Sequence, residues 1–227
     1  MTSRAFCIPG IFFLFCAFVL GVLVSISLPS LPALDIARVH FNGSPAQGVG
    51  AEMSQLRFGI WAYCTYDAST GQRVCIDQGH GYSLTIHTLT NNESVTIGSS
   101  WTRGLAVHPV ATGVTFIALL LSFSSHVTVT LISSLVSGLA TFLTLLAFAI
   151  DIALYAYVKH KLGGLDGVSE RTITGPGFWI TFATFILLLL ASCTVCFGRR
   201  RERMSGATSY PITNSGKKSF LSRFRKN

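Results

Sequence analysis

The sequence predicts a mainly α-helical membrane protein, in which a bundle of four transmembrane helices carries a small disulfide-bonded β-sheet on the exoplasmic side. Three observations support this fold class. Half of the 227 residues are hydrophobic, only 11% are charged, and the mean hydropathy is +0.55, a composition typical of membrane proteins. Four long apolar runs alternate with polar segments. The longest polar segment contains two cysteines and several short stretches rich in β-branched and aromatic residues.

The first apolar run follows a short N-terminal segment, residues 1–5, and covers residues 6–28 without a charge. A membrane span needs roughly 20 apolar residues. A cleaved signal peptide is the alternative interpretation, but its apolar core is normally only about 7–15 residues long. We therefore predict a retained first transmembrane helix with the N-terminus in the cytoplasm. Both interpretations place the next segment, residues 29–104, on the exoplasmic side.

This first exoplasmic loop is predicted to form a small sheet. Segments 56–66, 73–76, 82–89 and 94–97 are rich in β-branched and aromatic residues and are separated by Gly, Asn, Asp and Ser, so each is predicted to be a short strand. The loop also contains two Asn-x-Ser sequons. Asn92 is the better glycosylation candidate, because the sequon of Asn42 is followed by proline.

Two of the six cysteines, Cys64 and Cys75, lie in this loop and therefore in an oxidising compartment. They flank a Ser-Thr-Gly turn at residues 69–71, which favours a disulfide across a β-hairpin. Such a bridge would stabilise the fold by about 2–3 kcal/mol by restricting the unfolded chain. A metal site or a thiol nucleophile is the alternative, but no histidine lies at ligand spacing beside either cysteine.

The other three apolar runs cover residues 105–123, 127–158 and 175–197. We expect residues 124–126 to form a cytoplasmic turn, residues 159–174 a second exoplasmic loop, and residues 198–227 a cytoplasmic tail. At about 1.5 Å per residue, the third run would be about 48 Å long, beyond a hydrocarbon core of ~30 Å. Its outer end is therefore predicted to tilt or to project from the bilayer. Four spans place both termini in the cytoplasm.

The excess positive charge of the chain lies in the predicted tail. Residues 198–227 contain nine Lys or Arg and one acidic residue, whereas residues 1–197 contain eight of each sign. A nucleic-acid-binding protein would spread basic residues over a folded face, so no nucleic-acid partner is expected. We predict that the tail lies on anionic lipid of the inner leaflet, or alternatively that it only sets the topology. Its basic residues are Arg199, Arg200, Arg201, Arg203, Lys217, Lys218, Arg223, Arg225 and Lys226.

Asp151 is the one acidic side chain inside an apolar run. Charges inside a membrane often have a function. This residue lies roughly 36 Å along the third predicted helix, near the outer boundary. We therefore favour a structural polar contact, with water, Tyr155 or an exoplasmic residue, over an ion pathway. Cys196, next to the basic tail, is a palmitoylation candidate, and packing as a small apolar side chain is the alternative.

Five histidines are predicted to be exoplasmic or interfacial, and histidine titrates near neutral pH. This side of the protein is thus a candidate pH-responsive surface, although solvated polar side chains are the simpler interpretation. The residues are His40, His80, His87, His108 and His160.

No catalytic or cofactor-binding pattern emerges from the sequence. It contains no nucleophile paired with a base and an orienting group, no phosphate-binding glycine loop, no carboxylate pair and no metal-ligand cluster. We therefore expect that the protein is not an enzyme and needs no cofactor.

The chain resembles the fungal PalI family, which is related to the eisosome-associated tetraspans and, more distantly, to claudins. The resemblance rests on the motif Phe58, Gly59, Ile60, Trp61 and Tyr63, followed by Cys64 and Cys75. Segments 101–109 and 175–179 resemble the same family, and the similarity extends from residue 6 to about residue 203. The family implies a claudin-like bundle with a small exoplasmic sheet.

The resemblance also implies a non-enzymatic plasma-membrane protein with one of two roles. In the first, the protein is an accessory of ambient-pH signalling that supports a seven-span pH sensor. In the second, it organises cortical, eisosome-type membrane domains and contributes to cell-wall integrity. The expected partner is thus another membrane protein, such as a pH sensor or a cortical scaffold, and a homo-oligomer is also possible.

Overall fold

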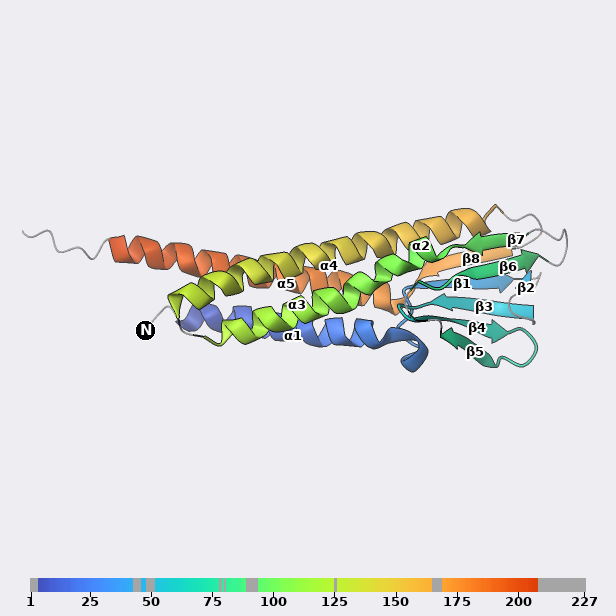
Figure 1. Cartoon of the computed structure of the whole chain (residues 1–227), viewed down its shortest axis with the longest axis horizontal. Helices are drawn as coiled ribbons and strands as arrows, with labels where there is room; N and C mark the ends of the chain where they lie inside the picture. Colours follow the sequence, from blue (N-terminus) through green and yellow to red (C-terminus); the bar gives the residue numbers. More distant parts are fainter. Residues whose placement is uncertain are drawn as a thin grey trace, which may run out of the picture.

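The computed structural model describes residues 4–42, 46–47, 52–77, 79, 81–88, 94–124, 126–164 and 169–207. Four long helices form an elongated bundle, and an antiparallel sheet sits at one end of it (Figure 1). The first turns of α1 and the last turns of α5 lie at the opposite end of the bundle (Figure 1). The predicted fold class, a mainly helical protein with four apolar helices and a small disulfide-bonded sheet, is confirmed.

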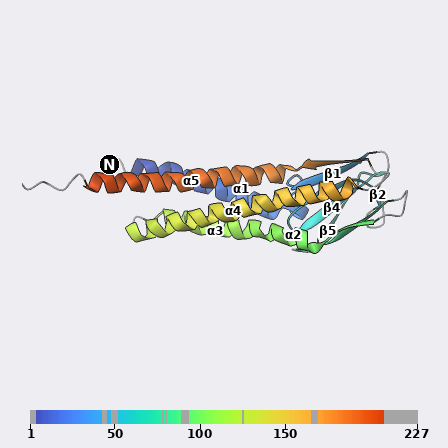
Figure 2. The same ribbon diagram turned by 90° about the horizontal axis from the view of Figure 1, so that it is seen from above.

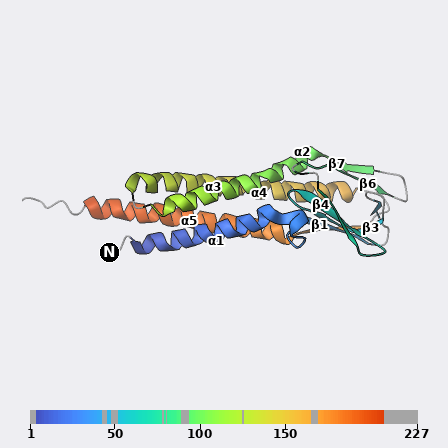
Figure 3. The same cartoon turned by 60° about the horizontal axis from the view of Figure 1, so that its bottom comes forward.

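Four helices are long and apolar enough to cross a membrane: residues Pro9–Ser30, Ser99–Ser122, Thr128–Leu162 and Pro176–Thr194. They lie around a ring in which α1 neighbours α3 and α5, and α4 neighbours the same two helices (Figure 3). Helices α3 and α5 therefore face each other across the diagonal of the bundle. The full helices are α1 Arg4–Ser30, α2 Ser99–Thr102, the 3-10 helix η1 Arg103–Ala106, α3 Val107–Ser122, α4 Val127–Leu162 and α5 Pro176–Ala207.

The helices extend beyond the predicted apolar runs 6–28, 127–158 and 175–197, because a helix can continue into polar residues once its apolar part has formed. The difference is largest in α5, which continues to Ala207 and so includes the start of the predicted tail. Residues 99–104, predicted to belong to the exoplasmic loop, are helical and lead through α2 and η1 into α3.

Within the described residues, eight strands form a single antiparallel sheet. One edge of β3 pairs with β4, which pairs in turn with β5. The other edge of β3 pairs with β1 over its C-terminal half and with β2 over its N-terminal half. The sheet then continues from β1 to β8 and from β2 through β6 to β7. The strands are β1 Ala37–Asn42, β2 Ala46–Gln47, β3 Glu52–Phe58, β4 Ala62–Asp67, β5 Arg73–Asp77, β6 Leu84–Thr88, β7 Ser94–Ile97 and β8 Ser169–Thr174.

The predicted strand 56–66 is wrong, because the chain turns between Phe58 and Ala62 and forms two strands. Predicted strands 73–76 and 94–97 match β5 and β7, and 82–89 is shortened to β6. Strands β1, β2 and β8 were not predicted. The β8 strand lies in the predicted second loop, residues 159–174, and its polar sequence becomes a strand through its pairing with β1.

The inner face of the sheet packs on the outer end of α4. Leu154, Val158 and Leu162, spaced four residues apart and thus on one side of the helix, join the buried core of the sheet. A helix of 36 residues is about 54 Å long, which exceeds the ~30 Å hydrocarbon core. Figures 1 and 2 both show the outer end of α4 running alongside the strands. The excess length of this helix thus supports the sheet.

Candidate functional site at the junction of sheet and bundle

The turn between β3 and β4 is bonded to the end of α1. The backbone N–H of Ile60 donates to Ser27 Oγ at 3.1 Å, and Trp61 Nε1 donates to the carbonyl oxygen of Ser25 at 2.7 Å. In an uninterrupted helix the Ser25 carbonyl would accept from the N–H of residue 29, but residue 29 is proline and has none. The backbone of α1 departs from helical geometry at Ser27 and Leu28. The helix end therefore presents a free carbonyl and a serine hydroxyl to the turn.

Gly59 is the tightest point of this junction. A Cβ atom added there would lie 2.5 Å from Leu28 Cβ, so only glycine fits between the turn and the helix end. The hydroxyl of Tyr82 donates to the Gly59 carbonyl at 2.8 Å, and the hydroxyl of Thr102 donates to the Tyr82 carbonyl at 2.7 Å. Burial raises the pKa of the Tyr82 phenol, which stays neutral and keeps its proton for this bond. These contacts connect α2, the segment before β6 and α1 through one buried turn.

The predicted disulfide is confirmed: Cys64 and Cys75 are bonded and face each other in the β4–β5 ladder. Cys64 is fully buried beside Leu28, on the same side of the sheet as the end of α1. The far end of this hairpin is held by Asp67, whose Oδ1 accepts from Ser69 N and Oγ and from Thr70 N. These hydrogen bonds, led by the one from the Ser69 hydroxyl, lower the pKa of Asp67 to about 2. The hairpin tip therefore does not titrate near neutral pH.

His40 lies on the outer face of the sheet. Arg57 Nε donates to Gln55 Oε1, so the amide nitrogen of Gln55 turns toward His40 and lies 3.0 Å from its Nδ1. Because an amide nitrogen is a donor, this contact requires an unprotonated ring nitrogen. Partial burial lowers the pKa of His40, and the nearby Arg38, Arg57 and Arg171 lower it further. His40 is thus held neutral in the neutral pH range.

Asp151 is completely buried and contacts His108, whose Nε2 lies 3.0 Å from Asp151 Oδ1. Of the polar contacts considered for Asp151, the one with Tyr155 is not formed: the Tyr155 hydroxyl lies 3.5 Å from the Thr172 carbonyl, so it extends toward β8. His108 is only 5% exposed and is therefore not a solvated interfacial residue. These residues were not paired from the sequence, because they belong to different helices. The signal that could have suggested the pair is the presence of one histidine and one aspartate in two otherwise apolar runs.

The remaining predicted site residues lie at element ends, on the surface or outside the described ranges. Asn42 ends β1, and the main chain of Cys196, Arg199, Arg200, Arg201 and Arg203 belongs to α5. His87 and His160 are exposed. Among the described residues, no group of three His, Cys, Asp or Glu side chains is arranged to hold a metal ion. The residues outside the described ranges are His80, Asn92, Lys217, Lys218, Arg223, Arg225 and Lys226.

We expect Gly59→Ala to destabilise the protein by about 1–3 kcal/mol, because the new methyl group collides with the Cβ of Leu28. Thermal unfolding of the purified protein in detergent measures this loss. The matched control is Gly113→Ala, since a Cβ at that helical position has no neighbour within 4 Å. Equal stability of the two variants would contradict the close contact between Gly59 and Leu28.

We expect Asp151→Leu to cost about 3–5 kcal/mol, because it leaves the buried His108 without its partner. The double variant His108→Leu/Asp151→Leu removes both polar groups and should recover much of that loss. Chemical unfolding of the two single variants and the double variant measures the coupling. Strictly additive losses would show that the two side chains do not stabilise each other.

The ring of His40 should titrate with a pKa below 6.5, the ordinary value. Since the folded-state pKa is depressed, the neutral ring stabilises the fold above pH 6.5, and this contribution is lost as the pH falls through the folded-state pKa. NMR titration of labelled histidine measures it. Arg171→Gln should raise the pKa by removing a like charge, whereas Lys161→Gln, not among the groups acting on His40, should leave it unchanged; equal effects would contradict this account.

Two comparisons with known proteins agree with this architecture. A sequence model of the SUR7/PalI family matches residues 6–191, which include the first three long apolar helices, the sheet and most of the fourth helix. The pH-response regulator protein palI/RIM9 of Yarrowia lipolytica is 32% identical over 155 residues. That alignment covers 63% of this chain but only 18% of the relative, so the chain spans a small part of that protein's length. The chain is thus a multi-pass membrane protein that belongs to the SUR7/PalI family.

Proposed function

We propose that this protein is a non-enzymatic accessory of ambient-pH signalling that supports a pH-sensing membrane protein at the plasma membrane. The name of the Yarrowia lipolytica relative, a pH-response regulator, supports the pathway. The observation that carries the accessory role is the junction itself. Polar groups of the family motif from Phe58 to Tyr63 bond to α1 and to Tyr82, which attaches the sheet to the bundle.

In this proposal the sheet faces the cell exterior, and both termini lie in the cytoplasm. The end of the bundle that contains the start of α1 and the end of α5 then faces the cytoplasm, and the basic residues after the fourth span lie near anionic lipid (Figure 1). The partner is a second membrane protein that contacts the sheet or the helices. A pH sensor is the partner that the relative's name favours.

Two titratable groups of the sheet, Asp67 and His40, support an accessory rather than the sensor itself. Asp67 has a pKa of about 2, and the pKa of His40 lies below its ordinary value of 6.5. Neither side chain changes its charge between neutral and alkaline pH. Detection of an alkaline environment therefore belongs, in this proposal, to the partner.

A strain in which the gene for this protein is deleted tests the proposal. We expect poor growth at alkaline pH and lost processing of the pH-response transcription factor, because the sensor lacks its accessory. The Gly113→Ala protein should restore both, whereas Gly59→Ala, which disturbs the seat of the sheet, should not.

Normal alkaline growth of the deletion strain, with dispersed cortical patches and sensitivity to cell-wall stress, would contradict the signalling role. That result would support the second role implied by the resemblance, the organisation of cortical eisosome-type domains. Crosslinking and affinity capture from membranes of the complemented strain identify the partner in either case, and also show whether a second copy of the chain is bound.

A further inference from the structure

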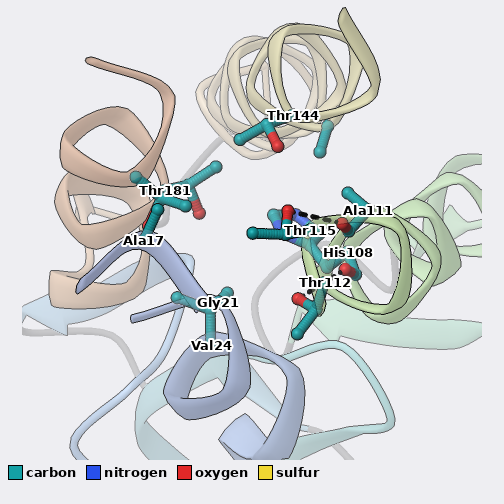
Figure 4. Close-up of a pocket in the computed structure, with 11 residues that line it drawn as sticks. Ala17, Gly21, Val24, His108, Ala111, Thr112, Thr115, Thr144 and Thr181 are labelled. Atoms are coloured by element: carbon teal, nitrogen blue, oxygen red, sulfur yellow. Dashed lines mark hydrogen bonds between the residues drawn. The ribbon is translucent and has the colours of Figure 1, made fainter. Parts of the chain in front are cut away.

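A small cavity lies at the centre of the helix bundle, next to the His108–Asp151 pair. Its volume is about 20 Å³, and His108 forms part of its wall. Figure 4 shows the lining side chains of α3, α4 and α5 converging on one space, with Ala17, Gly21 and Val24 of α1 closing it from below. One water molecule needs about 10–15 Å³ on the same measure, so the cavity has room for a guest of that size.

Most of the wall surface is apolar, but part of it is polar. Five threonines line it, and each hydroxyl donates its hydrogen to the backbone carbonyl four residues earlier in its own helix. Each oxygen keeps lone pairs that can accept a hydrogen bond, and that of Thr112 also contacts Ser25 Oγ. The threonines are Thr112 and Thr115 of α3, Thr144 of α4, and Thr181 and Thr184 of α5.

Asp151 lies next to this cavity through its contact with His108, although it does not itself line the wall. Thr144, Ala147 and Asp151 follow one another at spacings of three and four residues, so the carboxylate lies on the cavity side of α4, one turn beyond the wall. Its Oδ1 contacts His108, but its Oδ2 is buried and has no hydrogen-bond partner among the described residues. A buried carboxylate oxygen without a donor is costly, so the polar interior requires a further donor.

We propose that this cavity is an internal hydration site in which a water molecule is bound between the ring of His108 and the threonine oxygens. Water fits because it donates two hydrogen bonds to a wall of acceptors and can also bond to the imidazole. A buried water needs two to four polar partners, and His108 and the five threonines are the candidates in this wall.

The bound water bridges helices that lie across the bundle diagonal. Threonines of α3 and α5 face each other over the cavity, whereas the extensive direct contacts of the bundle run around the ring. The water thus adds a polar contact between two spans that do not pack closely on each other. This inference concerns the interior of the bundle and does not depend on the signalling role.

Solid-state NMR of the full chain in lipid nanodiscs, labelled at threonine and histidine, tests the proposal through transfer of magnetisation from water protons. We expect transfer to the Thr144 methyl group and to the ring of His108. Thr141 is the internal control: it lies on the same helix and donates to the carbonyl four residues earlier, but it does not line the cavity. Its transfer should be at least about twofold weaker.

The variant Thr144→Val/Thr181→Val should reduce the transfer to His108 at least twofold, whereas Thr141→Val should leave it unchanged. If the double variant fails to fold, the wild-type comparison of Thr144 with Thr141 decides alone. Absence of transfer to Thr144 and His108 in the wild-type protein would overturn the proposal. Signals of these residues that change when sodium is replaced by choline would identify a bound cation and would also overturn it.

Discussion

The junction depends on the broken end of α1. Proline at position 29 has no N–H, so the carbonyl of Ser25 has no donor within its helix. Trp61 supplies that donor, and the hydroxyl of Ser27 accepts from the next turn residue, Ile60. Buried polar groups of the backbone are expensive to leave unpaired. The end of α1 and the β3–β4 turn therefore satisfy each other's hydrogen bonds. These bonds fix the position of the sheet on the helix end.

The same requirement explains why this part of the protein is apolar and aromatic. Phe58 and Ile60 are fully buried, Tyr82 bonds to the Gly59 carbonyl, and the disulfide holds the neighbouring hairpin in register. Rigidity of this kind suits a protein that presents a surface to a partner, since a preorganised surface loses little conformational entropy on binding. The polar residues with unsatisfied bonding capacity lie elsewhere, in the bundle around His108 and Asp151.

Composition and periodicity predicted the four apolar helices, the disulfide and three of the eight strands, because each of these has a local signal. The turn at Gly59 was missed, since its sequence is rich in residues that favour strands and only the contact with Leu28 makes the glycine necessary. The polar β8 strand forms because β1 is beside it. The partner of Asp151 was also missed. His108 and Asp151 are 43 residues apart and lie on different helices, and such a contact leaves no periodic pattern in one sequence.

The length of α4 has a mechanical consequence. This helix runs without a break from the turn after α3, through the full bundle, to the inner face of the sheet. It contains no proline, and its one internal glycine, Gly138, lies in the half remote from the sheet, so bending is resisted along the outer half. A force on the sheet is therefore converted into tilt of a single rod about 54 Å long.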